Sequence, residues 1–122
     1  MDFKDLQNQV KHWAERNFPD AEAYQPLLGV VEEVGELSHS HLKMEQGIRG
    51  SERDHQIAKI DAVGDIVIYL ADYCWRNGIG FDEAVCNTWD KVKKRDWQKN
   101  PLNGRDNDEQ KNKMSGCKLH KS

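Results

Sequence analysis

Acidic side chains interrupt the two most apolar segments of this sequence. Glu33 and Glu36 lie among valine, glycine and leucine near residue 34, and Asp61 and Asp65 lie in a similar stretch near residue 64. Carboxylates lose hydration when a helix packs into a core, and neighbouring carboxylates repel one another. A bound divalent cation offsets both costs, because Mg2+ is held by carboxylate oxygens. The pattern therefore predicts two helices that share a cation site.

Helical periodicity accounts for most of the chain, and no run of strict two-residue alternation indicates a strand. The expected helices run from Phe3 to before Phe18, from Pro26 to about Gln46, from a capping box at Ser51 to Asn77, and from Phe81 toward Trp97. The length fits one domain with one core. We expect an all-α, four-helix domain over residues 1–99, followed by a polar tail over 100–122 that forms a mobile arm or packs on a neighbour.

The acids occupy defined positions on the two central helices. The apolar stripe of the second helix consists of Leu27, Val30, Val34, Leu37 and Met44. At 100° per residue, Glu33 and Glu36 lie along one edge of that stripe, whereas Glu32 points closer to the opposite side.

The third helix is apolar nearly all round, so we expect it to be buried on most sides. Asp61, Asp65 and Asp72 form a single stripe along it, with no Lys or Arg interleaved. That stripe could simply be the solvent face of the helix. The Glu33 and Glu36 pair on the preceding helix favours the metal site.

Composition limits the possible partners. The net charge of -3 leaves no broad basic surface for a nucleic acid polymer, and no apolar run reaches the roughly 18 residues that a membrane span needs. The three cysteines are odd in number and lack CxxC spacing, which indicates reduced thiols. The N-terminus shows no apolar signal segment. We therefore expect a cytoplasmic protein.

The motif residues resemble the MazG-like, all-α nucleoside triphosphate pyrophosphohydrolases, whose ExxE and ExxD motifs on successive helices bind Mg2+. Glu33 and Glu36 match the first motif, and Asp65 closes the second. Ala62 stands where the family has Glu, so we assign the fourth position to Asp61, which shares a helix face with Asp65 at i,i+4 spacing. Asp72, further along the same stripe, is the alternative fourth ligand.

The resemblance implies hydrolysis of a (deoxy)nucleoside triphosphate to the monophosphate and pyrophosphate in a homodimer or homotetramer. Nucleotide-pool house-cleaning is the role that this activity suggests. Mg2+, or Mn2+ in its place, would be held by Glu33, Glu36, Asp61 and Asp65. Glu32, Glu33, Glu36 and Asp65 form the expected catalytic set, and Lys91, Arg95 and Trp97 the expected substrate contacts. The base and the sugar of the substrate stay open.

Two other interpretations use the same helices. Glu36 with His39 and Glu52 with His55 form ExxH pairs, the unit found twice in di-iron helical bundles. The position of Glu52 at a helix start argues against this arrangement. A helical interaction module without catalytic activity is the third possibility, and it would tolerate loss of every acid.

Overall fold

The computed structural model describes residues 1–106, which contain four helices and no strand. The helices are α1 (Phe3–Asn17), α2 (Gln25–Gln46), α3 (Glu52–Arg76) and α4 (Phe81–Val92). The predicted all-α fold is therefore confirmed. None of the described helices is long and apolar enough to cross a membrane. Most of the polar segment 100–122 lies outside the described residues.

Local capping sets three helix ends where the sequence predicts them. Asp2 and Asp5 form a capping box at the start of α1, and Ser51 and Asp54 form another at the start of α3. In each box two backbone N–H groups gain side-chain acceptors. Gly47 ends α2 in the left-handed conformation (φ 68°), which glycine adopts without steric cost.

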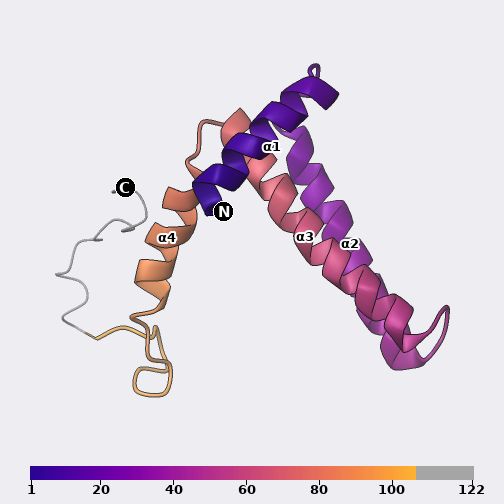
Figure 1. Cartoon of the computed structure of the whole chain (residues 1–122). Helices are drawn as coiled ribbons and strands as arrows, with labels where there is room; N and C mark the ends of the chain where they lie inside the picture. Colours follow the sequence, from indigo (N-terminus) through magenta and orange to yellow (C-terminus); the bar gives the residue numbers. More distant parts are fainter. Residues whose placement is uncertain (107–122) are drawn as a thin grey trace.

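The four helices are arranged around α3. Helices α2 and α3 pair side by side along their length, α1 lies across the end where α3 finishes, and α4 leads away from the pair (Figure 1). Helix α1 packs against α3 and α4 but not against α2. The side of α2 next to α1 is therefore left open within one chain.

The apolar core lies where α1, α3 and α4 meet. Val10, Ala71, Cys74 and Phe81 are buried there, and the partly buried residues packed around them are Phe3, Leu6, Val67, Leu70 and Val85. The Phe3 and Phe81 rings meet edge to face with their centroids 5.4 Å apart, a favourable aromatic geometry. The α3–α4 turn is fixed to α1 by the Gln7 amide, which donates to Ile79 O at 2.7 Å and accepts from Phe81 N at 3.0 Å.

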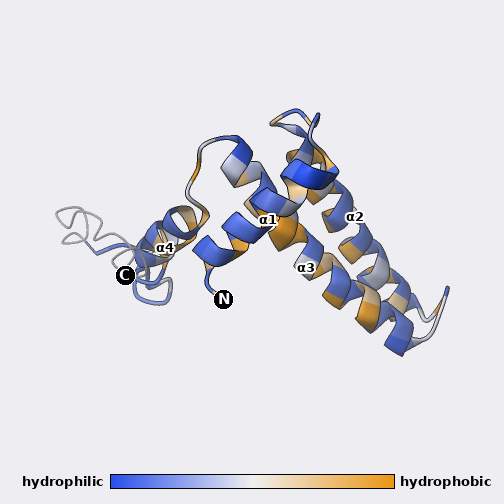
Figure 2. Cartoon of the chain, turned by 45° about the horizontal axis from the view of Figure 1, so that its top comes forward, coloured by the Kyte–Doolittle hydropathy of each residue, from blue (hydrophilic) through white to orange (hydrophobic). Residues whose placement is uncertain are grey.

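The remainder of the α2–α3 pair buries much less apolar surface than the sequence predicts. Val31 on α2 is 64 % exposed and Ile60 on α3 is 62 % exposed. Figure 2 shows hydrophobic stretches along both helices in the part of the pair that lies away from α1. The expectation that α3 is buried on most sides is wrong for a single chain, because α1 and α4 reach only its C-terminal half.

Helix α4 ends at Val92 and does not continue toward Trp97. The Asp96 side chain accepts hydrogen bonds from Gln98 N and Lys99 N, a turn that competes with helical hydrogen bonding. Asp96 N also donates to Gly104 O, so the chain around Gly104 folds back onto the residues that follow this helix. This part of the predicted tail contacts its own chain.

The cysteines only partly follow the prediction. Cys74 is a free thiol, and burial raises its pKa. Cys86 is disulfide-bonded, so the prediction of a reduced thiol is wrong at that position. Cys117 lies outside the described residues. The cysteines therefore give no support to the expected cytoplasmic location.

Candidate active site

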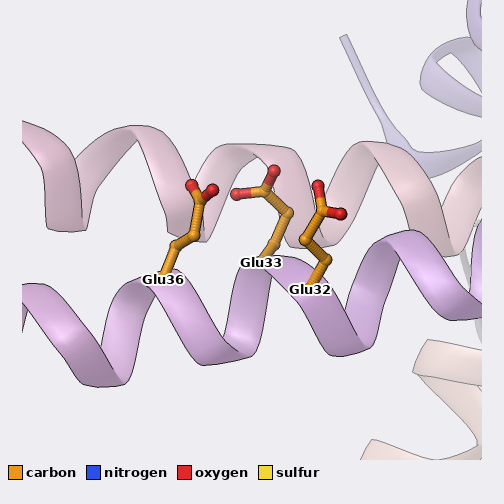
Figure 3. Close-up of side chains that lie close together, drawn as sticks. All are labelled: Glu32, Glu33 and Glu36. Atoms are coloured by element: carbon orange, nitrogen blue, oxygen red, sulfur yellow. The ribbon is translucent and has the colours of Figure 1, made fainter.

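Three carboxylates converge on one side of α2. Figure 3 shows Glu32, Glu33 and Glu36 rising from the same side of the helix, and one ligand atom of each lies within 4.8 Å of those of the other two. Residues three and four apart are neighbours on a helix surface, which explains why Glu36 meets both other residues. The prediction that Glu32 points closer to the opposite side is wrong, since its carboxylate joins the group.

Glu33 is the buried member of this group, with 8 % of its surface exposed. Its Oε2 atom is fully covered and has no hydrogen-bond partner. Burial raises the pKa of Glu33, and the negative charges of Glu36, Asp65 and Glu32 raise it further. A buried acceptor without a partner costs free energy, and nearby negative charge adds to that cost. A cation at this position would relieve both.

Asp65 brings α3 into the same site. Its charge raises the pKa of Glu33, and both residues line one cavity. Asp61 lies about one turn earlier on α3 and is exposed. Asp61 is not among the charges that raise the pKa of Glu33, and neither aspartate belongs to the close group on α2. These observations support a position beside Glu33 for Asp65. They give less support to such a position for Asp61.

Asp72 differs from the other aspartates of the predicted stripe. It is buried, and its Oδ1 atom accepts from Arg76 Nε at 2.7 Å and from Trp75 Nε1 at 2.8 Å. Arg76 follows one turn later, so the expectation that no basic residue neutralises this stripe is wrong at Asp72. Its carboxylate oxygen is committed to an ion pair within the fold.

A cavity of about 680 Å³ adjoins the acidic group. It lies between α1, α2 and α3, where the backbones of α1 and α2 do not come close to each other. The polar and charged lining residues are Gln9, Gln25, Glu33, Asp65 and Asp72, and the apolar and aromatic ones are Leu6, Val10, Trp13, Phe18, Ala21, Pro26, Ile68 and Tyr69. A cavity with apolar walls and a few converging polar groups is typical of a small-molecule site.

Tyr69 connects the cavity to the acids and was not among the predicted site residues. Burial raises its pKa, followed by the charges of Glu32, Glu33, Asp65 and Asp72. Its ring lies against α2 at Gly29, where a β-carbon would come within 2.7 Å of Tyr69 Cζ. Its place four residues after Asp65, on the same helix face, is the sequence signal that could have identified it.

The three predicted substrate contacts lie away from this site within one chain. Lys91 is on α4, and Arg95 and Trp97 follow that helix. Helix α4 packs on α1 and α3 but makes no contact with α2, and Figure 1 shows it leading away from the α2–α3 pair. Arg95 and Trp97 instead pack against Gly104 of the folded-back segment. They would reach the acids only if another chain brought them there.

The histidines of the ExxH pairs do not gather with the acids. His55 is buried near the start of α3, where its Nε2 atom lies 2.9 Å from Ile48 O, and His39 is exposed. Within residues 1–106, the cluster of three or more possible metal ligands contains glutamates alone. The described residues therefore give the di-iron interpretation no ligand set.

No protein-family model, curated protein or solved structure matched the chain. The resemblance to MazG-like proteins accordingly stays a prediction from the motif residues Glu33, Glu36 and Asp65.

Proposed function

We propose that this protein is a Mg2+-dependent nucleoside triphosphate pyrophosphohydrolase, which converts its substrate to the monophosphate and pyrophosphate. The observation that carries the proposal is the buried Glu33 carboxylate, whose Oε2 atom has no hydrogen-bond partner within a group of three carboxylates. The donors are all carboxylate oxygens, the ligand type that suits Mg2+ and also Mn2+. The residues present therefore fit the cation.

Each acid has a proposed role. Glu33, Glu36 and Asp65 hold the cation, with Asp61 as the fourth ligand. When bound, Mg2+ supplies positive charge to the phosphates and lowers the pKa of a water molecule. Glu32, exposed at the edge of the group, orients that water or accepts its proton as it attacks the α-phosphorus in line.

The adjoining cavity is the proposed place for the nucleobase. Trp13, Phe18 and Tyr69 provide aromatic surface, and the amides of Gln9 and Gln25 provide hydrogen-bonding groups. The acids stand at one side of this cavity, so a base held there would direct its phosphates toward the cation. The cavity volume of about 680 Å³ is in the range of known small-molecule sites.

We further propose that the functional unit is a homodimer, or a homotetramer of two dimers. The exposed apolar residues of α2 are Leu27, Leu28, Val31, Val34 and Leu42. Their spacings place them on one helix face, and on α3 the exposed Ile60 and Val63 continue the stripe that Val67 and Ala71 bury in the core. A second copy would cover these faces, and its Lys91 or Arg95 could then supply positive charge to the phosphates.

The proposal is tested by assaying a panel of ribo- and deoxynucleoside triphosphates for pyrophosphate release. Activity should require Mg2+ or Mn2+ and should be lost in Glu33→Gln and Asp65→Asn. Glu15→Gln, an exposed acid on α1, is the matched control and should behave like the wild type. Equal rates with and without metal, or no release from any nucleotide, would refute the proposal.

The exposed apolar faces of α2 and α3 also favour a second candidate, a helical interaction module without catalytic activity. In that case Glu36→Gln would leave both the oligomeric state and the interactions of the protein unchanged. Under the enzymatic proposal the same variant keeps its fold but loses turnover.

A further inference from the structure

The segment between α1 and α2, residues 18–24, is anchored by side chains at the end of α3. Arg76 Nη1 donates to Ala21 O at 3.2 Å, and Arg76 Nη2 donates to Phe18 O at 3.3 Å. Asn77 Nδ2 donates to Ala23 O at 2.9 Å. Two adjacent side chains thus hold three backbone carbonyls of a segment that lies more than 50 residues earlier in the chain.

Arg76 is itself held in one orientation. Its Nε atom donates to Asp72 Oδ1 at 2.7 Å, and Trp75 Nε1 donates to the same oxygen at 2.8 Å. The guanidinium carbon lies 4.7 Å from the centre of the Trp75 ring. The side chains of Arg76 and Asp72 are 7 % and 12 % exposed. A guanidinium presents its donors in a rigid plane, so fixing one edge also directs the other.

The anchored segment forms one wall of the cavity beside Glu33. Phe18 and Ala21, whose carbonyls Arg76 holds, line this cavity together with Asp72 and Glu33. The Phe18 ring also meets the edge of Trp13, another lining residue, at 5.6 Å between centroids. The ion pair therefore links the end of α3 to the surface proposed to receive the base.

We propose that Arg76, oriented by Asp72, is a positioning residue that keeps this wall formed before substrate binds. This inference rests on the proposed function. Arg76 holds the side of the cavity formed by residues 18–24, whereas the acids lie on α2 and α3. Losing the anchor should therefore reduce the fraction of molecules with a complete wall, which weakens apparent substrate affinity in proportion. Turnover of the bound substrate should change little.

The experiment uses the full chain and the triphosphate that the wild type hydrolyses fastest. The variants are Arg76→Met, Arg76→Lys, and the double change Asp72→Asn with Arg76→Met, which avoids a buried unpaired carboxylate and so protects the fold. Arg53→Met, at an exposed position in the first turn of the same helix, is the matched control. KM, kcat and the Mg2+ concentration for half-maximal activity are measured for each. Hydrogen exchange is followed at two amides of the segment: that of Ala21, which donates to Phe18 O, and that of Glu22, which donates to the Gln25 side chain.

The Arg76→Met and double variants should raise KM on the order of tenfold, as expected if the wall is formed in about a tenth of the molecules. Their kcat should stay within about twofold, the Mg2+ requirement should not shift, and exchange at Ala21 and Glu22 should accelerate. Arg76→Lys keeps the charge but not the planar donors, so its KM should be intermediate. The Arg53→Met control should match the wild type throughout.

An unchanged KM in the double variant, or a loss of kcat without a change in KM, would overturn the positioning role. A wild type that hydrolyses no nucleotide would instead overturn the proposed function. The anchor would then be judged by exchange alone, with faster exchange at Ala21 and Glu22 supporting it and unchanged exchange refuting it.

Discussion

The two halves of α3 carry one apolar stripe but have different surroundings. In the C-terminal half, Val67, Ala71 and Cys74 pack beneath α1 and α4. In the N-terminal half, Ile60 and Val63 continue the same stripe at spacings of four and seven residues, yet both are more than half exposed. Periodicity identifies an apolar face, and the placement of neighbouring helices determines which part of that face one chain covers.

The acidic group adjoins the less covered half. Asp65 precedes Val67 by two residues, and its partner Glu33 lies on the helix that pairs with α3. Substitutions of the buried apolar residues in the covered half should therefore act mainly on the free energy of unfolding. Substitutions in the open half should act on activity and assembly.

Phe81→Ala should produce the largest loss of stability. The Phe81 ring is 5 % exposed and packs against Phe3 and the covered half of α3, so truncation should lower the free energy of unfolding by about 3–5 kcal/mol. Ile60→Ala is the matched variant in the open half and should cost no more than about 0.5 kcal/mol. Urea denaturation at a protein concentration where light scattering shows single chains measures both. Equal losses would remove the distinction between the two halves.

Glu36→Gln should separate activity from stability. The change keeps the shape of the side chain, removes one of the repelling charges on α2, and should leave the chain as stable as the wild type or more so. Turnover should fall at least about a hundredfold, as when a group that stabilises the transition state is removed. Pyrophosphate release measures the turnover of the variant and of the wild type, and thermal melts of the same preparations measure their stability. Wild-type rates would place the active site elsewhere.

Charges placed on the open faces should disrupt assembly. Val31→Asp combined with Ile60→Asp should raise the dissociation constant of the proposed dimer at least about tenfold, since an unpaired buried charge costs more than 1.4 kcal/mol. Sedimentation at several protein concentrations provides the measurement, with Leu102→Asp as an exposed apolar control outside α2 and α3. A wild type that sediments as one chain at every concentration would contradict the prediction.

The smallest expected effect comes from the ionisation of Glu33. It should make the stability of the metal-free protein, measured in EDTA, depend on pH. Its pKa is raised in the folded state, whereas the unfolded carboxyl titrates at its ordinary value of 4.5. The folded chain therefore binds this proton more tightly, and the resulting stability is complete below pH 4.5 and lost as the pH rises through the folded-state pKa.

In Glu33→Gln this dependence should disappear, so the melting temperature of the variant should rise relative to that of the wild type as the pH increases above 4.5. If the melting temperatures of the two proteins change with pH in the same way, the charged form of Glu33 does not destabilise the fold.

Sequence alone predicted the helices well, and it predicted part of the group of carboxylates on α2. The capping boxes at Ser51 and Asp2, and Gly47 at the end of α2, act within a few residues, so local sequence determines them. The convergence of Glu33 and Glu36 follows from helix spacing alone. These features needed no knowledge of how the helices pack.

The missed features depend on contacts between distant segments. Asp72 shares the stripe of Asp65 but is neutralised by Arg76, and that arginine also reaches Phe18, 58 residues away in sequence. The cavity exists because α1 meets α3 and not α2, which no single periodicity encodes. Lys91 was expected to contact the substrate because its segment resembles the one that contacts substrate phosphates in MazG-like proteins, but α4 leads away from α2.

The central claim is that the group around Glu33 binds a divalent cation, and Mg2+-dependent melting of the wild type and Glu33→Gln tests it most directly. A ligand that binds only the folded state adds about 2.7 kcal/mol when present at a hundred times its dissociation constant. The wild type should therefore melt at progressively higher temperature as Mg2+ replaces EDTA, while Glu33→Gln should not respond. Identical melting temperatures of the wild type in EDTA and in millimolar Mg2+, or an equal response in the variant, would contradict the claim.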